Sequence, residues 1–172
     1  MKKHLVLIGL PGAGKTTVGR LVAERLQGGF VDIDSILVRK EGKPIPMIFA
    51  EKGESAFRGL EKAEVEQALA NQPSVIAPGG GWAAQPGAME LAKSGGYVIY
   101  LKTRPETAAS RATPQGTRPM LMGDDPEAQM RALLKEREPA YLKADAKVET
   151  DRKTAAQVAD DIVSLARTGA GW

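Results

Sequence analysis

The chain has 172 residues, 42% of them hydrophobic and 26% charged, which is typical of one globular domain and short for two. It contains no cysteine and one histidine, so disulfides, thiolate catalysis and zinc–sulfur sites are excluded and a multi-histidine metal site or histidine triad is disfavoured. A net charge of only +3 and 5% aromatic residues argue against nucleic acid as a partner, and no segment approaches the ~18 apolar residues of a membrane span. We therefore expect a cytoplasmic monomer that binds small molecules.

The first predicted strand, residues 5–8, leads directly into a phosphate-binding loop. Residues 9–16 match the pattern G-x-x-x-x-G-K-[ST], and a helical pattern of apolar residues follows. Glycines let the backbone N–H groups of such a loop point inward around an anion, and the start of the helix adds the positive end of its dipole. Lys15 is expected to contact the outer phosphates and the Thr16 hydroxyl to ligate Mg²⁺, so the sequence predicts a nucleoside triphosphate site. His4, at the start of the strand, is expected at the surface.

A second strand is predicted at residues 30–34, with two acids at its end. Asp32 and Asp34 are two positions apart, so their side chains would leave the same face of a strand. An enzyme with a phosphate loop needs a second acid near Mg²⁺, and the strand predicted at residues 74–77 ends without one. Asp32 is therefore the candidate for the metal, and Asp34 is left to face a substrate hydroxyl. The alternative is that Asp34 only caps a helix and Asp32 is a solvated acid.

The longest helix predicted before the strand at residues 74–77 spans residues 54–71. It places Arg58 and Glu61 one turn apart. Two short helices, residues 35–40 and 46–51, precede it. The pair is either an exposed ion pair of little energetic value or a guanidinium held in place for a carboxylate. The candidate buried positions on the long helix are Phe57, Leu60, Ala63, Ala68 and Leu69.

Three consecutive glycines, Gly79, Gly80 and Gly81, follow the strand at residues 74–77. They are either a plain flexible turn or a place where a ligand approaches the backbone closely, and at a strand end the second reading is favoured. The phosphate loop, the two acids and these glycines all follow predicted strands. Because ligands of parallel sheets bind beyond the carboxyl ends of the strands, we expect the three stretches to line one cleft.

The second half of the chain contains a candidate lid at residues 112–125, which are rich in Thr, Pro, Gly and Met and show no periodicity. Segments of this length in compact domains are usually lids or disordered. Arg118 within it, with Arg111 just before it, is suited to covering a transferring phosphate. The other elements expected here are a helix at 88–93, a strand at 97–101, helices at 106–111 and 126–137, a strand at 146–149, a helix at 154–165 and a frayed end at 168–172.

Strands alternate with helices along the whole chain, which predicts an α/β three-layer sandwich with right-handed crossovers. We expect a central parallel sheet of about five strands, helices on both faces and a mobile lid. No repeat or linker interrupts the pattern, so residues 1–172 are expected to form a single P-loop kinase domain. Its substrate-binding segment is expected at about residues 34–61 and its lid at about residues 112–125.

In these motifs and their order the chain resembles the shikimate kinases over nearly its whole length. The matching pieces are the phosphate loop through Gly19, Phe30-x-Asp32-x-Asp34, Gly53-Glu54-x-x-Phe57-Arg58-x-x-Glu61, Gly79-Gly80-Gly81, Arg118-Pro119-x-Leu121 and Arg137-x-x-x-Tyr141. The phosphate loop alone is generic, whereas Phe-Arg-x-x-Glu combined with the triple glycine is specific. Departures from the usual pattern of that family are Pro44, Pro46, Pro78, Trp82 and Met120.

The resemblance implies ATP-dependent phosphorylation of the 3-hydroxyl of shikimate, with Mg²⁺, in the pathway to chorismate and the aromatic amino acids. It implies that Arg58 and Arg137 bind the shikimate carboxylate, and that Asp34 binds ring hydroxyls and accepts the reacting proton. Lys15 and Arg118 would be the other catalytic groups, and Thr16 and Asp32 the metal ligands. The ring would lie against Gly79, Gly80, Gly81, Phe49 and Phe57; the ATP contacts would be Gly12, Ala13, Gly14, Lys15, Thr16, Thr17, Arg111, Arg118 and, near adenine, residues 150–153.

Three other functions stay open on the residues alone. A gluconate or nucleotide kinase shares the phosphate loop, although Arg58, Arg137 and the triple glycine favour a small carboxylated ring. A GTPase-like switch that reads guanine through Asn-Lys-x-Asp is disfavoured, because the only asparagine is Asn71, inside a predicted helix. An RNA-binding module is suggested only by the slight excess of basic residues.

Overall fold

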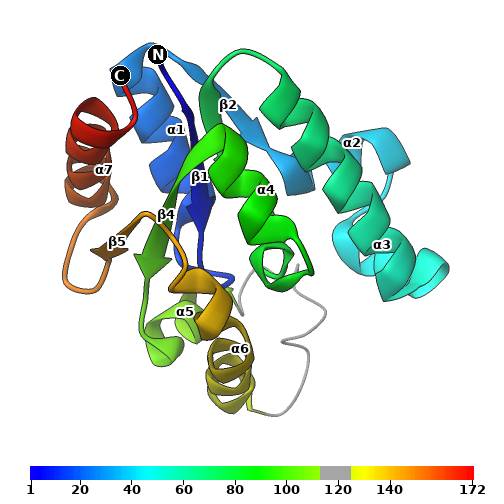
Figure 1. Cartoon of the computed structure of the whole chain (residues 1–172). Helices are drawn as coiled ribbons and strands as arrows, with labels where there is room; N and C mark the ends of the chain where they lie inside the picture. The colour runs from blue at the N-terminus through cyan, green and yellow to red at the C-terminus, as the bar shows by residue number, and fades with distance from the viewer. Residues whose placement is uncertain (113–124) are drawn as a thin grey trace.

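A sheet of five parallel strands forms the centre of the part of the chain that the structure, a computed structural model, describes: residues 1–112 and 125–172 (Figure 1). The strand order is β2-β3-β1-β4-β5, and every neighbouring pair is parallel. The strands are β1 (His4–Ile8), β2 (Gly29–Asp32), β3 (Ser74–Ala77), β4 (Gly96–Lys102) and β5 (Ala146–Glu149). The predicted parallel α/β fold with five strands is thereby confirmed, whereas the predicted lid falls almost wholly outside the described residues.

Helices connect the strands, as parallel pairing requires. They are α1 (Lys15–Leu26), α2 (Ile33–Glu41), α3 (Ile45–Ala70), the short 3₁₀ helix η1 (Trp82–Ala84), α4 (Ala88–Gly95), α5 (Pro105–Ala112), α6 (Pro126–Tyr141) and α7 (Ala155–Gly169). The backbone of Gly53 (φ 84°, ψ 164°) interrupts α3, so the two helices predicted at 46–51 and 54–71 are both present. Pro44 and Pro46 stand at the start of α3, where a missing backbone N–H is tolerated, and they leave the helix intact.

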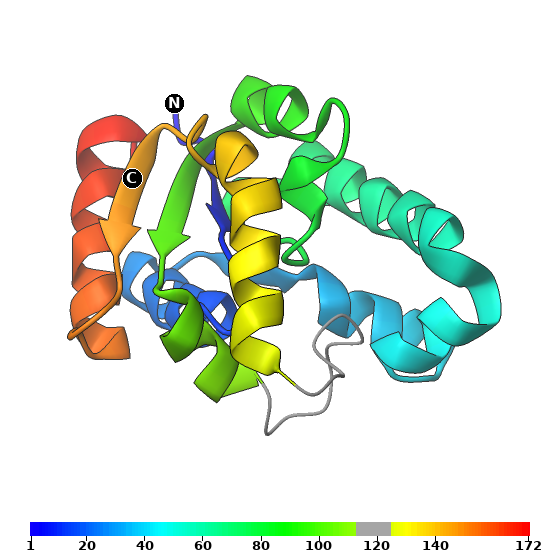
Figure 2. The same ribbon diagram turned by 90° about the horizontal axis from the view of Figure 1, so that it is seen from below.

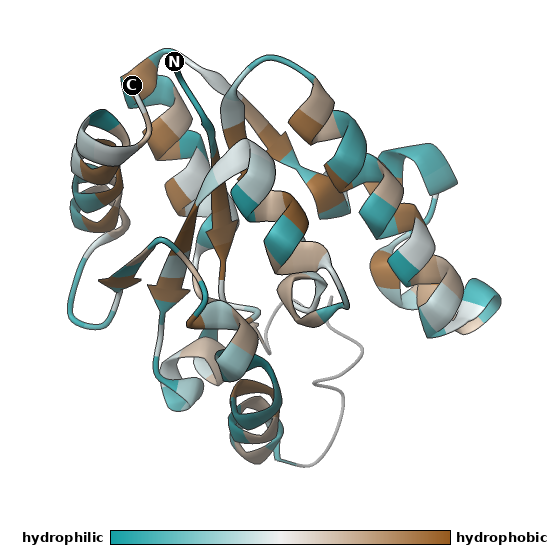
Figure 3. Ribbon diagram, viewed as in Figure 1, coloured by the Kyte–Doolittle hydropathy of each residue, from teal (hydrophilic) through white to brown (hydrophobic). Residues whose placement is uncertain are grey.

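The two faces of the sheet carry separate hydrophobic cores. Leu5 and Leu7 of β1 pack with α1 and α7 on one face, whereas Val6 and Ile8 pack with α3, α4 and α6 on the other. This alternation follows from the two-residue side-chain period of a strand, and burial on both faces explains why β1 is apolar throughout. The central strands are accordingly mostly hydrophobic in Figure 3. The three layers are therefore two sets of helices with the sheet between them.

The α2 helix and the first part of α3 project beyond the β2 edge of the sheet, away from α7 (Figures 1 and 2). The carboxyl ends of β1, β2 and β3 lead into the phosphate loop, α2 and the triple glycine, respectively. The expected meeting of these three stretches at one edge of the sheet follows from this topology. None of the helices in the described ranges has the length and apolar character that crossing a bilayer requires.

The predicted strand at residues 30–34 ends two residues early, which corrects the expectation that Asp32 and Asp34 share one strand face. Asp32 is the N-cap of α2, and its carboxylate accepts a hydrogen bond from the Ser35 backbone N–H at 3.3 Å. Asp34 lies in the first turn of α2. The N-cap bond satisfies an N–H group that the helix leaves unpaired, so the chain turns into the helix directly after β2.

Three further expectations are wrong. His4 is buried, with Nδ1 accepting from the Ser74 N–H at 3.1 Å and Nε2 3.1 Å from the Leu69 carbonyl. The end of the chain is anchored and not frayed, since the Trp172 indole N–H donates to the Lys3 carbonyl at 2.9 Å. Ala63 is exposed, whereas Val65, which was not expected inside, is buried.

Candidate active site at the carboxyl edge of the sheet

The phosphate loop wraps around the start of α1 in a conformation that only glycine adopts easily. Gly12 and Gly14 have φ of 83° and 91°, and a Cβ at Gly12 would overlap the Ala108 carbonyl of α5. The Lys15 ammonium donates to the carbonyls of Gly9 and Leu10 at 2.7 and 2.8 Å, folded back onto the loop. The loop thus has the glycine geometry, the helix start and the cation that were predicted for a phosphate site.

Thr16 and Asp32, the two predicted metal ligands, lie side by side. The Thr16 hydroxyl donates to the Asp32 carboxylate at 2.9 Å. Both groups offer the hard oxygen atoms that Mg²⁺ prefers, so the pair fits this ion. Residues 1–112 and 125–172 contain no cluster of three or more His, Asp or Glu side chains suited to a metal.

The backbone of residues 79–81, here called the triple-glycine loop, lies directly against the predicted substrate-binding side chains. A Cβ at Gly79 would overlap the Glu61 carboxylate and lie 3.2 Å from Oδ1 of Asp34. A Cβ at Gly81 would overlap the Arg58 guanidinium and lie 2.9 Å from Nη2 of Arg137. Charged groups from α2, α3 and α6 therefore converge on one short backbone segment, and glycine is required there because they stand so close.

Arg58 and Glu61 form a buried ion pair, 2.8 Å between Nη1 and Oε1. Glu61 is 0% exposed, so the reading of this pair as an exposed surface ion pair does not apply. Burial raises the pKa of the Glu61 carboxyl above its ordinary value, and the positive charge of Arg58 opposes that shift. Among the described residues, Nε of Arg58 and Oε2 of Glu61 are buried and have no hydrogen-bond partner within the chain.

Two aromatic rings and the phosphate loop complete the surroundings. Phe49 and Phe57 stack with their ring centroids 4.4 Å apart, and the Arg58 guanidinium lies 5.5 Å from the Phe57 centroid. On the other side of the triple-glycine loop, a Cβ at Gly80 would lie 3.0 Å from Cδ of Pro11. The candidate substrate side chains and the phosphate loop are thus adjacent, as phosphoryl transfer between two bound molecules requires.

Tyr141, to which the sequence assigned no role, holds the triple-glycine loop from behind. Its hydroxyl is fully buried and donates to the Gly80 carbonyl at 2.6 Å. Burial raises the pKa of the Tyr141 hydroxyl to about 12, so it remains a hydrogen-bond donor throughout the neutral range. The spacing Arg137-x-x-x-Tyr141 is the sequence signal, because it puts both side chains on one face of α6.

Arg111 lines a cavity of about 210 Å³ beside the phosphate loop. Gly14 and Thr17 form its wall on the loop side, and Thr150 and Lys153 form the opposite wall. The cavity therefore joins the residues that the sequence suggested for the adenine end of ATP.

Two other arginines were also predicted in the site. Arg137, which is 5% exposed, points to the triple-glycine loop. Arg118 lies outside the described residues.

The chain matches the family model described as shikimate kinase over residues 11–167. It is 43% identical over 162 residues to a shikimate kinase of Moorella thermoacetica, covering 94% of this chain and 93% of that protein. A relative from Caldanaerobacter subterraneus subsp. tengcongensis, also a shikimate kinase, is 40% identical over 161 residues, 94% of each chain. The structure of shikimate kinase from Acinetobacter baumannii in complex with shikimate superposes with a TM-score of 0.93 at 37% identity, over 98% of this chain and 94% of that one.

A gluconokinase from Sinorhizobium meliloti is similar in fold alone, with a TM-score of 0.67 and 18% identity over 99% of this chain and 94% of that one. The gluconate kinase reading of the sequence therefore gains no support beyond a shared architecture.

Proposed function

Because this chain belongs to the shikimate kinase family, we propose that it transfers the γ-phosphoryl group of ATP to the 3-hydroxyl of shikimate, giving shikimate 3-phosphate. This is a step toward chorismate and the aromatic amino acids. The observation that carries the proposal is the convergence of Asp34, Arg58 and Arg137 on the triple-glycine loop, next to the phosphate loop. One acid and two guanidiniums around a backbone segment without side chains suit a ring that carries a carboxylate and several hydroxyls.

Arg58 and Arg137 are the proposed carboxylate clamp. A guanidinium presents parallel N–H donors that match the two oxygens of a carboxylate, which an ammonium does not. Glu61 fixes the orientation of Arg58 through the 2.8 Å bond, so the clamp is preorganised before the substrate arrives. Phe49 and Phe57 supply the apolar wall for the ring, and the triple-glycine loop lets the ring approach the backbone.

Asp34 is the proposed proton acceptor. The hydroxyl oxygen of the substrate attacks the γ-phosphorus, the bond from that phosphorus to the β,γ-bridging oxygen breaks, ADP leaves, and the hydroxyl proton passes to the Asp34 carboxylate. Lys15 turns from the Gly9 and Leu10 carbonyls to the phosphate oxygens, and Arg118 is the second proposed cation. These cations neutralise the charge that develops during transfer, which is most of what this chemistry needs from a protein.

Thr16 and Asp32 are the proposed holders of Mg²⁺, the first through its hydroxyl and the second through metal-bound water. The ion supplies charge neutralisation on the phosphates when it is bound. Gly12, Ala13, Gly14 and Thr17 would contact the phosphates, and Arg111 would contact the nucleotide in the cavity beside the loop. We further propose that residues 1–172 act as one kinase domain, monomeric and cytoplasmic.

The test is a coupled assay of ADP release with ATP, Mg²⁺ and shikimate, compared with the same mixture without shikimate and with gluconate in its place. ADP release that depends on shikimate, with a single phosphate on the 3-oxygen by ³¹P and ¹H NMR, is the expected result. Equal ADP release in all three mixtures, or preference for gluconate, would reject the proposed substrate.

A further inference from the structure

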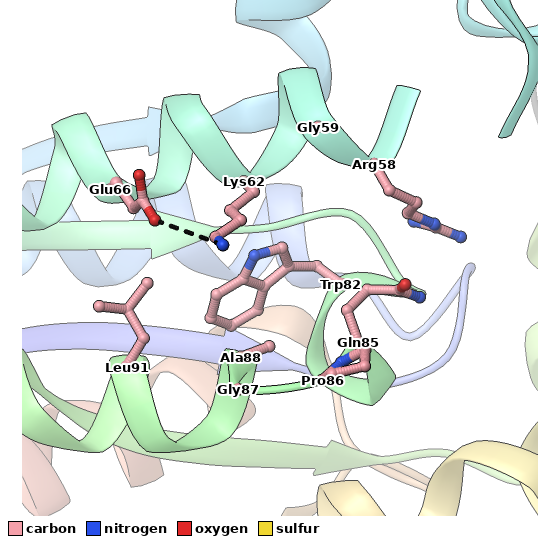
Figure 4. A pocket seen from close by; sticks show the side chains of 10 residues that line it. All are labelled: Arg58, Gly59, Lys62, Glu66, Trp82, Gln85, Pro86, Gly87, Ala88 and Leu91. Atoms are coloured by element: carbon pink, nitrogen blue, oxygen red, sulfur yellow. Dashed lines mark ion pairs between the residues drawn. The ribbon is translucent and has the colours of Figure 1, made fainter. Parts of the chain in front are cut away.

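A surface groove lies between α3 and the segment that joins η1 to α4, outside the residues assigned above to ATP, metal and ring binding except for Arg58. Its volume is about 400 Å³, within the range of small-molecule sites. Figure 4 shows Gly59, Lys62 and Glu66 of α3 on one side, Trp82 at the base, and Pro86 and Leu91 on the other side. We call this cavity the α3–α4 groove.

Gly59 is the feature of the groove that packing does not explain. It lies within α3 without a positive φ, and no described atom comes within 4 Å of a Cβ built there. Gly19 in α1 is different, since a Cβ there would collide with Phe30. Glycine inside a helix is less stable than alanine, so Gly59 lowers helix stability with no steric need. Its effect is to keep one wall of the groove open.

The groove combines an apolar interior with one accessible cation. Pro86 and Leu91 give it an apolar surface, and Trp82, which is 1% exposed, lies buried beneath them. Lys62 lines the groove, and its ammonium lies 4.0 Å from the Glu66 carboxylate (Figure 4). Both side chains are half exposed or more, so the pair is weak and Lys62 is available to another anion. We propose that the α3–α4 groove is a second ligand site, which binds a small, largely apolar organic molecule carrying one carboxylate.

Two groove residues also contact the substrate site. Arg58 lines the groove and stands against Gly81, and the Gln85 side chain, which lines it too, donates to the Gly81 carbonyl at 3.1 Å. A carboxylate in the groove lies near Arg58 and weakens the attraction of that cation for a second anion. Groove ligand and shikimate therefore bind antagonistically, each weakening the other by the same finite factor. This coupling rests on the proposed function, whereas binding in the groove does not.

Binding is measured by fluorescence. The chain has two tryptophans, so Trp172→Phe leaves Trp82, at the base of the groove, as the one tryptophan, which is excited selectively over the three tyrosines. Phenylacetate is the probe and phenylacetamide, its uncharged analogue, is the control. A saturable change in Trp82 emission with phenylacetate, at least about tenfold weaker with the amide, is expected. No saturable change up to about 10 mM phenylacetate would overturn the proposal.

Three variants in the Trp172→Phe background locate the site. Gly59→Leu fills the groove and is expected to abolish the phenylacetate response without lowering the melting temperature, because leucine is the better helix former. Gln67→Leu places the same side chain at an exposed position of α3 that does not line the groove, and should leave the response unchanged. Lys62→Ala is expected to weaken binding about tenfold. An unchanged response in both Gly59→Leu and Lys62→Ala would contradict the assignment.

Kinetics separate this site from the substrate site. Increasing phenylacetate is expected to raise the KM for shikimate until it reaches a plateau. The Gly59→Leu variant is expected to lose this effect and to have a normal KM for shikimate without phenylacetate. Competitive inhibition without a plateau that persists in Gly59→Leu would mean that the probe occupies the substrate site, and would overturn the proposal. If the protein consumes no ATP in response to shikimate, the proposed function fails, and the fluorescence titration still decides the groove.

Discussion

At the level of single residues, the charged side chains around the triple-glycine loop have two different roles. Arg58 and Arg137 stand against Gly81, whereas Asp34 stands against Gly79. The two ends of this loop therefore differ in charge, and a ring that carries a carboxylate at one position and hydroxyls elsewhere is oriented by that difference. Each residue can be tested separately, because binding of the carboxylate and transfer of the proton affect different kinetic constants.

Replacing Asp34 by asparagine is expected to lower kcat by roughly 10²–10⁴-fold, because an amide of the same shape cannot accept the hydroxyl proton. Steady-state kinetics with shikimate as the varied substrate will measure this change. The KM for ATP should stay within about threefold, since Asp34 lies with the substrate side chains and not on the phosphate loop. A variant with near-normal kcat would remove Asp34 from the proton transfer.

Replacing Arg58 by lysine should act mainly on binding. The ammonium cannot bridge two carboxylate oxygens and also keep the bond to Glu61, so the KM for shikimate is expected to rise roughly 10- to 100-fold. The measurement is the KM for shikimate and for ATP in one assay. Equal changes in both constants would show that the substitution disturbs the site as a whole.

The raised pKa of Glu61 predicts that lowering the pH weakens shikimate binding but increases the contribution of Glu61 to the free energy of unfolding. Its pKa is raised above the ordinary value of 4.5 by burial, so it gains its proton at a higher pH than an exposed glutamate does. Protonation removes the negative charge that orients Arg58, and the KM for shikimate should therefore rise as the pH falls through the raised pKa.

The folded chain holds this proton more tightly than the unfolded chain, so the contribution of Glu61 to stability increases as the pH falls through the same window. KM and the free energy of unfolding, measured together as the pH is lowered from neutrality to the ordinary pKa of 4.5, will test both signs. Glu61→Gln should have a high KM at every pH and lack this dependence. A KM that is flat in the native protein and rises only below pH ~4.5 would contradict the raised pKa.

At the level of elements, α6 connects the triple-glycine loop to the rest of the molecule. Tyr141 donates to Gly80, and its ring packs on Tyr100, with centroids 5.0 Å apart. Tyr100 in turn donates to Glu138 at 2.7 Å. The triple-glycine loop, which glycine alone would leave pliable, is therefore fixed by the same helix that carries Arg137, a proposed ligand of the substrate carboxylate.

Tyr141→Phe is expected to raise the KM for shikimate several-fold while leaving the KM for ATP nearly unchanged, because the buried Gly80 carbonyl loses its donor. The free energy of unfolding should fall by about 1–3 kcal/mol in urea titrations. The matched control is Tyr100→Phe, which removes the bond to Glu138 but no contact to the loop. If both variants change the KM equally, Tyr141 acts through general packing and not through the loop.

The elements that the sequence predicted well are those whose signals are local. The strands at 74–77 and 146–149 have the predicted bounds, because each is a short run between turn residues. The strand at 30–34 was predicted too long, since an apolar residue, Ile33, continues the pattern while the Asp32 cap has already started α2. The helix predicted to end at Arg137 continues to Tyr141, with Pro139 inside its last turn, so a residue type that usually ends a helix does not end this one.

The site residues that the sequence predicted are likewise those whose signals are local. The phosphate loop and the Arg58–Glu61 pair follow from spacing within one segment. Tyr141 could not be assigned, because its partner Gly80 is 61 residues away and a sequence does not show which backbone carbonyl a buried hydroxyl meets. The α3–α4 groove is likewise a product of packing between two helices, and Gly59 alone gave no sign of it.

On the scale of the whole molecule, the carboxyl ends and the amino ends of the parallel strands form two opposite edges of the sheet, and these two edges have different roles. The carboxyl ends of β1, β2 and β3 carry the candidate site, whereas the amino end of β1 and the end of the chain carry contacts that only stabilise. Both chain ends lie together at this second edge (Figure 1). The Lys3 N–H donates to the Ala170 carbonyl at 2.9 Å, and Ala170 is buried. Substitutions at this edge should therefore change stability without changing catalysis.

Trp172→Ala tests this separation. The indole N–H donates to the Lys3 carbonyl, the ring lies so close to Gly28 that a Cβ there would be 2.8 Å from it, and the Lys2 ammonium lies 4.7 Å from the ring centroid. Losing these contacts is expected to lower the free energy of unfolding by about 1–3 kcal/mol. Trp172→Phe keeps an aromatic ring and loses the hydrogen bond, so its loss should be smaller. Both variants should keep native kcat and KM, because these contacts of the Trp172 side chain with Lys2, Lys3 and Gly28 lie away from the candidate site. A changed KM would mean that the two ends of the strands are energetically coupled through the sheet.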